Sequence, residues 1–543
     1  MNTKDTLYNT YVNAQRNNAE KTAIFTRENQ TITHGMLLEE IDKAAAGLLL
    51  HKTEKSFKVG IISSSSYEEA VFLLAVNKIG AVSKFIDFTK NVTEISESIA
   101  ESSIALLVMG AEFLPMEPYI NPSALPVVVL GESPLLRPHY QAYRDFLESN
   151  SSVNVAPAAY ESNKCAVIIN SSGTTGTPKP IELSDRAMNA AVVKMAITDY
   201  PLHQDNLLLK IIPSHIGMGL ITSLYTGLIL GVPIIYLAGF GPQESIRCFV
   251  EMINGYDSFL KVNHLSSDTK LLIFGAPMYF RALLQLFDQL QNLSFIGCML
   301  AGGSAMSKEE LEIMDAAFAS KGCCVPVLNG YGQNEMAGAV TLNRNNKNCR
   351  GSAGVAVSGT ELLIVDMQTG VPVKQNKVGT ILERSESLFI QYENMAKETK
   401  ASFITINSQE WFNTHDVGYL DEDGFLFITG RTSRIIIRFD MKVSLDKMES
   451  KIRMSKYVKE VGVVSQKGDV YDTTVAFVLL NDEYKSAGIC PDTIIENIQQ
   501  SRNPLNEIEK VDRLFIVDDL PYRSSGKIDY RALEKQAEDM RKA

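Results

Sequence analysis

Short apolar segments and amphipathic helical segments alternate along most of this chain, and this alternation constrains its fold more than any other feature. The helical segment 67–81 is followed by an apolar run, and 246–255 leads to the apolar 270–275. A further helical segment, 277–290, precedes the apolar 295–303. Repeated strand–helix–strand units predict largely parallel sheets covered by helices, in which ligands bind at the carboxyl ends of strands. We therefore expect an α/β fold with its site at such an end.

The chain is long enough for more than one domain, because 543 residues exceed what a single core usually serves. The pattern changes after residue 429. A helical segment, 444–457, leads into two apolar strands within 460–480, and a further strand is expected at 512–519. We expect a large, multi-layered N-terminal domain at 1–429 and a small α+β C-terminal domain at 435–543.

Composition and charge narrow the class of protein. Hydrophobic residues at 45% and charged residues at 21% are typical of globular proteins, and a net charge of −11 disfavours nucleic acid as a partner. Seven cysteines without a CxxC pair, and a polar start without the apolar core of a signal peptide, predict reduced thiols and a cytoplasmic location. The uncharged stretch 211–243 could span a membrane, but its many glycines favour a buried helix followed by a core strand.

A loop rich in glycine and hydroxyl residues follows the apolar segment 165–169. Its sequence, SSGTTGTPK at 171–179, offers unobstructed backbone N–H groups, hydroxyls and one ammonium group, which together can bind an oligophosphate. The commoner phosphate loop has four residues between its glycines, whereas Gly173 and Gly176 enclose two. A flexible linker is the alternative, but a linker needs neither the preceding strand nor the Pro-Lys at its end.

The loop resembles the signature loop of the adenylate-forming enzymes, which include acyl- and aryl-CoA synthetases, adenylation domains of peptide synthetases and luciferases. Four further segments match that family in the same order: AGGSAMS (301–307), NGYGQNE (329–335), HDVGYLDEDGFLFITGR (415–431) and YRSSGKIDYRAL (522–533). The resemblance implies an ATP-dependent carboxylic acid ligase that forms an acyl-adenylate with Mg²⁺. The acyl group would then pass to the thiol of CoA or of a carrier-protein phosphopantetheine. It also implies that 435–543 swivels at a hinge, 430–434.

The resemblance assigns residues to the nucleotide. The β- and γ-phosphates would bind Ser171, Ser172, Gly173, Thr174, Thr175, Gly176 and Lys179. The adenine would lie against the backbone of Gly302, Gly303 and Ser304 and stack on Tyr331, and Asp416 would bind the ribose with help from Arg431. The cofactor-binding set is completed by Asn329, Gly332 and Asn334.

Three residues are assigned to the chemistry. Glu335 would hold Mg²⁺, which prefers oxygen ligands, and Lys527 would reach the acyl carboxylate and the α-phosphate. His215 resembles a histidine that borders the acid pocket in acyl-CoA synthetases; an ordinary core histidine is the alternative. The opposite pocket wall would consist of Asn329, Met336, Ala337 and Gly338. The stretch around His215 lacks the aspartate that pairs with the substrate ammonium group in amino-acid-activating relatives. Its absence favours a carboxylic acid without an amino group as the substrate.

The chain departs from the family at several positions: Asn334 replaces a threonine, Pro180 and His415 replace glycines, and Ser433 stands at the hinge position. Asn334 can still donate to a phosphate oxygen. Asp440 replaces a glycine beside which the thiol acceptor passes, and its charge should hinder that approach. Two alternatives therefore remain: an amide synthetase that passes the acyl group to an amine, and a degenerate nucleotide-binding module without turnover.

Overall fold

The computed structural model describes residues 2–52, 57–64, 66–121, 123, 125–131, 137–149, 154–171, 178–237, 242–304, 306–438, 441–466, 472–501, 504–522 and 528–542. It contains two compact units, Met1–Glu361 with Arg384–Glu410 and Leu362–Glu383 with Trp411–Ala543. By this packing, residues 411–429 belong with the C-terminal residues. A division by packing does not identify the residues at which one domain moves on the other. The expected domain limits at 1–429 and 435–543 and the hinge at 430–434 therefore stay predictions.

The first unit contains a nine-stranded sheet in the order β16-β15-β14-β13-β12-β10-β11-β1-β2. The pairs from β14 to β1 are parallel, and both edges end in antiparallel pairs. The strands are β1 Thr22–Phe25, β2 Thr31–Thr33, β10 Leu207–Lys210, β11 Ile234–Tyr236, β12 Leu271–Gly275, β13 Ile296–Ala301, β14 Val327–Gln333, β15 Gly338–Leu342 and β16 Val355–Ala356.

A second, eight-stranded sheet of the same unit has the order β19-β9-β8-β4-β3-β5-β6-β7. Its pairs from β8 to β7 are parallel, and β9 pairs antiparallel with both β8 and β19. The strands are β3 Lys58–Ile62, β4 Val82–Phe85, β5 Leu106–Gly110, β6 Val127–Leu130, β7 Tyr140–Ala142, β8 Cys165–Asn170, β9 Pro180–Ser184 and β19 Gln391–Tyr392. The predicted α/β class with largely parallel sheets is confirmed.

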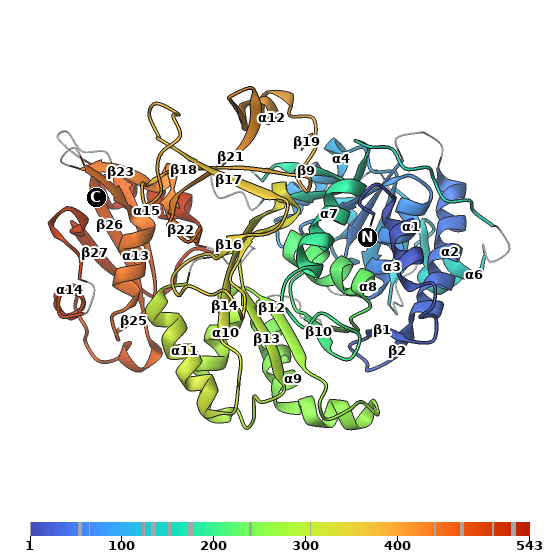
Figure 1. The fold of residues 1–543 in the computed structure, drawn as a ribbon, viewed down its shortest axis with the longest axis horizontal. Helices are drawn as coiled ribbons and strands as arrows, with labels where there is room; N and C mark the ends of the chain where they lie inside the picture. Colours follow the sequence, from blue (N-terminus) through green and yellow to red (C-terminus); the bar gives the residue numbers. More distant parts are fainter. Residues whose placement is uncertain are drawn as a thin grey trace. The chain divides into compact units, whose positions relative to one another are not determined.

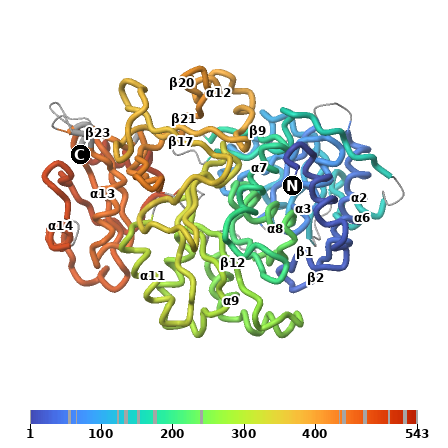
Figure 2. Tube along the Cα trace, viewed as in Figure 1, coloured from blue at the N-terminus to red at the C-terminus, as the bar shows by residue number. Residues whose placement is uncertain are grey.

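Helices cover these sheets (Figure 1). In Figure 2, α1 at the N-terminus lies beside α3 and α8, which follow far later in the chain. Besides short 3-10 turns, the helices and the remaining strand of the first unit are α1 Leu7–Gln15, α2 His34–His51, α3 Glu68–Lys78, α4 Val92–Glu101, α5 Glu117–Ile120, α6 Tyr143–Glu148, α7 Asp185–Ala196, a π-helix (η2) Met218–Tyr225, α8 Thr226–Leu230, α9 Pro242–Val262, α10 Pro277–Gln285, α11 Lys308–Ser320, α12 Ala396–Ala401 and β20 Phe403–Ile406.

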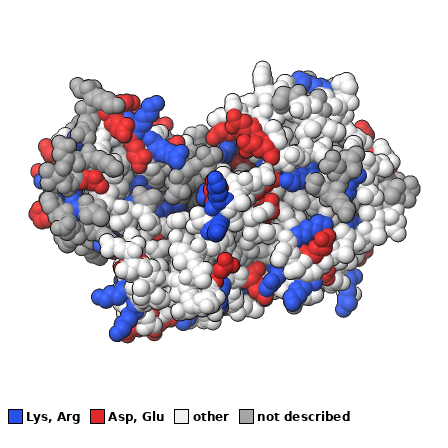
Figure 3. Space-filling view, turned by 90° about the horizontal axis from the view of Figure 1, so that it is seen from above, with Lys and Arg blue, Asp and Glu red and all other residues white. Residues whose placement is uncertain are grey.

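The uncharged stretch folds as predicted, into buried helix followed by the buried strand β11. None of the described helices combines the length and the hydropathy that crossing a membrane requires. All seven cysteines are free thiols. On the face that Figure 3 views, described acidic and basic side chains are interspersed.

The second unit combines an antiparallel group of strands with a small α+β layer. The first group contains most of β17 Thr360–Val365, β18 Gly379–Ser385 and β21 Gln409–Leu420, whose end residues at 360–361, 384–385 and 409–410 belong to the first unit, together with β22 Leu426–Arg431. The hairpin β23 Ile435–Arg438 and β24 Met441–Ser444 follows. The layer contains α13 Leu445–Arg453, β25 Val458–Gln466, β26 Thr473–Leu480, α14 Pro491–Gln499, β27 Arg513–Val517 and α15 Tyr530–Lys542. Apolar residues of α13 and α14 pack on one face of its three strands and those of α15 on the other.

The strand that leads into NGYG (329–332) is longer than the apolar run 325–328 indicates, because Asn329 to Gln333 continue β14. The reason is a change of partner. Up to Asn329 the strand pairs in parallel with β13, and from Gly330 onward it pairs antiparallel with β15. A strand that gains a new partner has no reason to end where the first pairing stops.

Candidate functional site

Part of the predicted site lies outside the described residues. This holds for Ser172, Gly173, Thr174, Thr175 and Gly176 of the loop, and for Lys527 and Asp440. The remaining predicted residues are described and fall on both compact units. The geometry of each unit is given separately below.

In the first unit, the predicted phosphate loop connects the two strands of an antiparallel hairpin, β8 and β9. Asn170 and Pro180, which flank the loop, form the strand pair next to it. At its base, the Ser171 N–H donates to the Lys179 carbonyl at 2.8 Å, and the Lys179 N–H donates to the Ser171 hydroxyl oxygen at 2.9 Å. Lys179 is thus fixed where the chain returns to the sheet.

Lys179 and the predicted metal ligand Glu335 meet on one tyrosine. The ammonium of Lys179 lies 4.6 Å from the ring centroid of Tyr392. The hydroxyl of Tyr392 donates to the Glu335 carboxylate at 3.1 Å. Tyr392 is buried, whereas Lys179 and Glu335 are half-buried. Burial, together with the Glu335 charge, raises the pKa of Tyr392, so the phenol stays protonated and acts as a hydrogen-bond donor.

Asn334 joins three segments at the same place. Its amide nitrogen donates to the Asn170 carbonyl at 2.7 Å, directly before the loop, and its amide oxygen accepts the Gly217 N–H at 3.1 Å. A Cβ at residue 217 would lie 2.6 Å from that oxygen, so only glycine permits this contact. One N–H of the amide is left after these bonds, which is the donor that the predicted phosphate contact needs.

The segments predicted to hold the adenine lie at the ends of neighbouring strands. Gly302 follows β13, and its N–H donates to the Gly275 carbonyl at the end of β12 at 3.0 Å. Gly303, at φ +88°, and Ser304 are exposed. Tyr331 is half-buried, and its hydroxyl accepts from the Gln333 amide at 2.9 Å. Residue 332 must be glycine for packing alone, because a Cβ there would lie 2.1 Å from the Gly338 carbonyl oxygen.

His215 is buried in the loop before the π-helix, with only Ser214 between it and Pro213. Its Nε2 lies 3.3 Å from the Asp87 carboxylate, and its ring packs edge-on against Phe88 at 4.9 Å. Burial lowers the pKa of His215, although Asp87 acts in the opposite direction. Among the described residues, no partner bonds its Nδ1. A π-helix is rare and often marks a functional site, so this position favours the pocket assignment.

In the second unit, Asp416 and Arg431 are directly opposite each other on β21 and β22. Their side chains form an ion pair at 3.2 Å, in which Asp416 is 4% and Arg431 30% exposed. His415 has a φ of +59°, which is the left-handed region that glycine adopts most easily. The substitution of glycine by histidine at residue 415 therefore keeps a backbone conformation that glycine favours.

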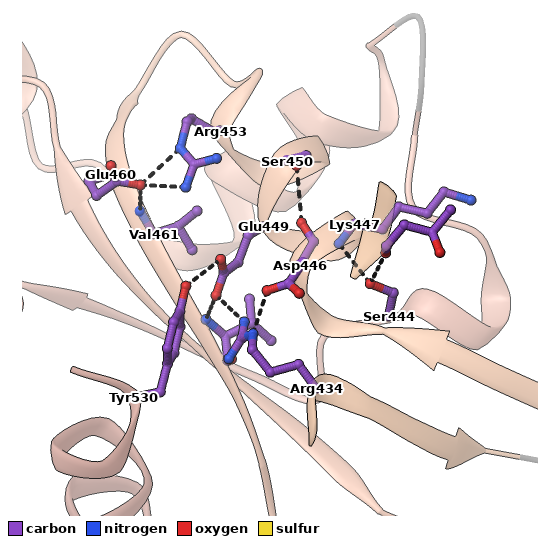
Figure 4. Close-up of polar contacts among 12 residues, drawn as sticks. Arg434, Ser444, Asp446, Lys447, Glu449, Ser450, Arg453, Glu460, Val461 and Tyr530 are labelled. Atoms are coloured by element: carbon purple, nitrogen blue, oxygen red, sulfur yellow. Dashed lines mark hydrogen bonds and ion pairs between the residues drawn. The ribbon is translucent and has the colours of Figure 1, made fainter. Parts of the chain in front are cut away.

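A cluster that the sequence did not predict contains Arg434, the last residue of the expected hinge (Figure 4). Arg434 forms an ion pair with Glu449 at 2.6 Å and another with Asp446, and its guanidinium stacks 3.6 Å from the ring centroid of Tyr530. The Tyr530 hydroxyl donates to Glu449 at 2.8 Å, and the Val463 N–H donates to the same carboxylate at 2.7 Å. We call Arg434, Glu449 and Tyr530 the hinge-side cluster.

Tyr392 and its neighbour Glu393 were also missed. Glu393 is buried and bonds the ammonium of Lys58 at 2.6 Å, that of Lys84 at 3.3 Å and the Ser102 hydroxyl at 2.6 Å. Glu335, Lys58 and Lys179 are far from this segment in sequence, so no local pattern indicates these contacts. An aromatic residue followed by an acidic one is too common to have singled out this pair.

The chemistry of the donor set fits Mg²⁺. Within the described part of the chain, no group of three or more His, Cys, Asp or Glu side chains could hold a metal by itself. Mg²⁺ is usually bound by one or two carboxylates together with substrate phosphates and waters. Glu335, half-buried and close to the predicted phosphate loop, provides one such carboxylate.

Comparison with known proteins gives a consistent result. The sequence model described as "AMP-binding enzyme" matches residues 11–393. The chain is 24% identical to 4-coumarate–CoA ligase 5 of Oryza sativa subsp. japonica, over 92% of this chain and 88% of that protein. It is 26% identical to 2-succinylbenzoate–CoA ligase of Listeria monocytogenes, over 94% and 95%. Its fold is similar to that of ATP-bound MatB from Rhodopseudomonas palustris, with a TM-score of 0.82, 20% identity, and coverage of 99% and 100%.

Proposed function

The chain belongs to the AMP-binding enzyme family, and we propose that it is an ATP-dependent acid–thiol ligase. The observation that supports this most directly is the meeting of Lys179 and Glu335 on Tyr392 at the base of the glycine-rich loop. A cation for phosphate and a carboxylate for a metal ion are the two groups that an ATP site of this kind requires. The CoA ligases similar to this chain over most of its length support the same conclusion.

The first half-reaction forms an acyl-adenylate. A carboxylate oxygen of the acid attacks the α-phosphorus of ATP, the bond from that phosphorus to the bridging oxygen breaks, and pyrophosphate leaves with the electron pair. Lys179 and the loop bind the departing phosphates, and Lys527 stabilises the charge that develops at the α-phosphate. Asp416 binds the ribose hydroxyls, with Arg431 oriented by its ion pair. Glu335 would hold Mg²⁺, which would neutralise charge on the phosphates.

The second half-reaction transfers the acyl group to a thiol. The thiol loses its proton as its sulfur attacks the acyl carbon, the bond from that carbon to the phosphate oxygen breaks, and AMP leaves with the electron pair. The relatives that were compared are named as CoA ligases, which favours CoA as the thiol; a carrier-protein phosphopantetheine has the same reactive group. The substrate is a carboxylic acid, with His215 at the wall of its pocket. The stretch around His215 lacks the aspartate that would pair with a substrate ammonium group, which favours an acid without an amino group. The cytoplasmic location stays a prediction.

Pyrophosphate release with a panel of aliphatic and aromatic acids tests the proposal. Lys527→Ala should slow release about 10²–10³-fold, since it removes a positioned donor at a site of developing charge. Lys535→Ala is the control, because this exposed lysine of α15 lies outside the predicted site. Equal rates for the parent and Lys527→Ala would remove Lys527 from the mechanism. A parent that releases no pyrophosphate with any acid would favour the degenerate nucleotide-binding module.

The acceptor is tested at Asp440. If a pantetheine arm passes close to the backbone there, Asp440→Gly removes a side chain and a negative charge from its path. Single-turnover transfer from preformed acyl-adenylate to CoA should then become faster, with adenylation nearly unchanged. Slower or equal transfer, together with acyl transfer to an amine, would favour the amide synthetase.

A further inference from the structure

Tyr392 contacts both charged residues that the proposed ATP site depends on, yet neither its sequence position nor any of the five motifs assigns it a role. Its hydroxyl donates to Glu335 and its ring lies under the ammonium of Lys179. Glu335 and Lys179 come from segments that are separated by more than 150 residues. Tyr392 is thus a physical link between the side chain of the predicted metal ligand and the base of the phosphate loop.

Neither of the two contacts brings a counter-charge to Glu335 or Lys179. A carboxylate offers about four lone-pair sites, and the Tyr392 hydroxyl occupies one of them. A ring face attracts an ammonium group without providing a counter-charge and without accepting its N–H bonds in the way that a carboxylate does. An acidic residue at position 392 would hold Lys179 more strongly, but it would cancel the charge that phosphate binding uses.

Tyr392 is itself fixed by the surrounding chain. Its strand, β19, pairs with β9 directly after the loop, with Tyr392 opposite Ile181. The backbone N–H of Phe389 donates to the Glu335 carbonyl at 2.7 Å, and the Ser387 hydroxyl donates to the Met336 carbonyl at 2.8 Å. The segment 387–392 is therefore attached to the Glu335 segment by backbone contacts as well as by the tyrosine.

The next residue anchors the strand from its other side. Successive side chains of an extended chain point in opposite directions, and Glu393 is bonded to Lys58, Lys84 and Ser102, none of which contacts Tyr392 among the described interactions. Burial opposes ionisation of Glu393, but Lys84, Lys58 and Ser102 outweigh it and hold its pKa below the usual range. A buried, charged anchor of this kind restricts the position of Tyr392.

We infer that Tyr392 is a positioning residue that holds the Glu335 carboxylate and the Lys179 ammonium in place for a magnesium–nucleotide complex. The inference rests on the proposed function and extends it to a residue outside the five motifs. It separates two roles of one side chain: the hydroxyl acts on the metal ligand, and the ring acts on the phosphate-binding cation.

Titration calorimetry with ATP, in the presence of Mg²⁺ and in the presence of EDTA, distinguishes these roles. Tyr392→Phe removes only the hydroxyl, so binding of ATP with Mg²⁺ should weaken on the order of tenfold, while binding in EDTA stays unchanged. Tyr392→Leu also removes the ring, so binding in EDTA should weaken as well, by roughly threefold or more. In a Lys179→Ala background, Tyr392→Leu should cause no further loss in EDTA.

Tyr256→Phe is the matched control. Tyr256 is fully buried in the same unit, and its hydroxyl donates to the Thr269 carbonyl at 3.1 Å, away from the predicted site. It should leave ATP binding unchanged with and without Mg²⁺. The inference is overturned if Tyr392→Phe binds like the parent under both conditions, or if it weakens both equally, as a general loosening of the fold would.

Pyrophosphate exchange by the same variants separates this inference from the proposed function. A parent that binds ATP with the expected Mg²⁺ dependence but exchanges pyrophosphate with no acid would contradict the proposed ligase activity and leave the role of Tyr392 standing. A parent that exchanges pyrophosphate, with a Tyr392→Phe variant of identical Mg²⁺ dependence, would contradict the role of Tyr392 alone.

Discussion

Two tyrosines of this chain make the same pair of contacts in different surroundings. Tyr392, in the first unit, donates to Glu335 and lies under Lys179. Tyr530, in the second unit, donates to Glu449 and lies under Arg434. In the hinge-side cluster the cation also forms an ion pair with the same glutamate, and both charged side chains are at least 90% buried. Around Tyr392, both charged side chains are half-buried.

The difference shows which arrangement suits a ligand and which suits the fold. In the hinge-side cluster, Arg434 and Glu449 compensate each other within the protein. Removing Arg434 leaves a buried carboxylate, and removing Glu449 leaves Arg434 with only the partly exposed Asp446. Around Tyr392, a neutral ring and a hydroxyl contact the two charged groups, and neither contact adds a counter-charge. We therefore expect substitutions at the first site to affect activity and substitutions at the second to affect stability.

The largest expected effect is on activity at the first site. Glu335→Gln keeps an acceptor for the Tyr392 hydroxyl but removes the charge that Mg²⁺ requires, so acid-dependent pyrophosphate exchange should fall roughly 10²–10³-fold. Because Glu335 is half-buried, the free energy of unfolding should change by less than about 1 kcal/mol. Activity within a few-fold of the parent would break the contrast between the two sites.

The corresponding substitution in the second unit, Glu449→Gln, should act on stability instead. It leaves the buried Arg434 paired only with the more exposed Asp446, and removing one partner of a buried ion pair costs about 3–5 kcal/mol. Urea denaturation of the folded chain measures this loss. Glu460→Gln is the control, because the Arg453–Glu460 pair in the same unit is partly exposed and should cost no more than about 1 kcal/mol. Equal losses for the two variants would contradict the special role of the hinge-side cluster.

A smaller effect separates the two hydroxyls. Tyr530→Phe removes one hydrogen bond to a buried carboxylate, which should cost about 1.5–3 kcal/mol of stability, while the ring still stacks on Arg434. Tyr392→Phe should cost less, since the half-buried Glu335 can bond to water instead. Thermal unfolding of the two variants, side by side, checks the order; a lower melting temperature for Tyr392→Phe would reverse it.

The smallest effect is a change of stability with pH at the anchor of Tyr392. The folded pKa of Glu393 is lowered from 4.5, so its stabilising contribution is fully present above about pH 4.5 and is lost as the pH falls through the folded value. Acid unfolding curves of the parent and of Glu393→Gln should therefore differ in slope below pH 4.5 and run parallel above it. Parallel curves throughout would mean that Glu393 does not stay ionised in the folded chain.

Much of this fold could be predicted, because the alternation of helical and apolar segments is a local property of the sequence. The segment 67–81 forms α3, and 277–290 contains α10, as expected. The end of β14 could not be predicted, because it depends on pairing with β15, which the apolar run before Asn329 does not indicate.

In the candidate site, too, some contacts could be predicted from the sequence and others could not. Asp416 and Arg431 belong to one predicted motif, and their cross-strand pairing follows from a short connection between two strands. The contact of Tyr392 with Lys179 depends on the folded arrangement of distant segments, and no spacing in the sequence gives it. The hydrogen bonds of the Asn334 side chain to Asn170 and Gly217 could not be predicted either, because they also join segments that are distant in sequence.

The adjacency of Tyr392 and Glu393 has a consequence for how this region can vary in length. Because neighbouring side chains alternate between faces, insertion or deletion of one residue between Phe389 and Tyr392 would turn the tyrosine toward Lys58 and Lys84 and the glutamate toward Lys179. A carboxylate would then neutralise the cation at the base of the loop. Insertions or deletions of two residues in this segment should therefore be tolerated more readily than those of one residue. In the exposed turn at 367–370, odd and even changes of length should be tolerated alike.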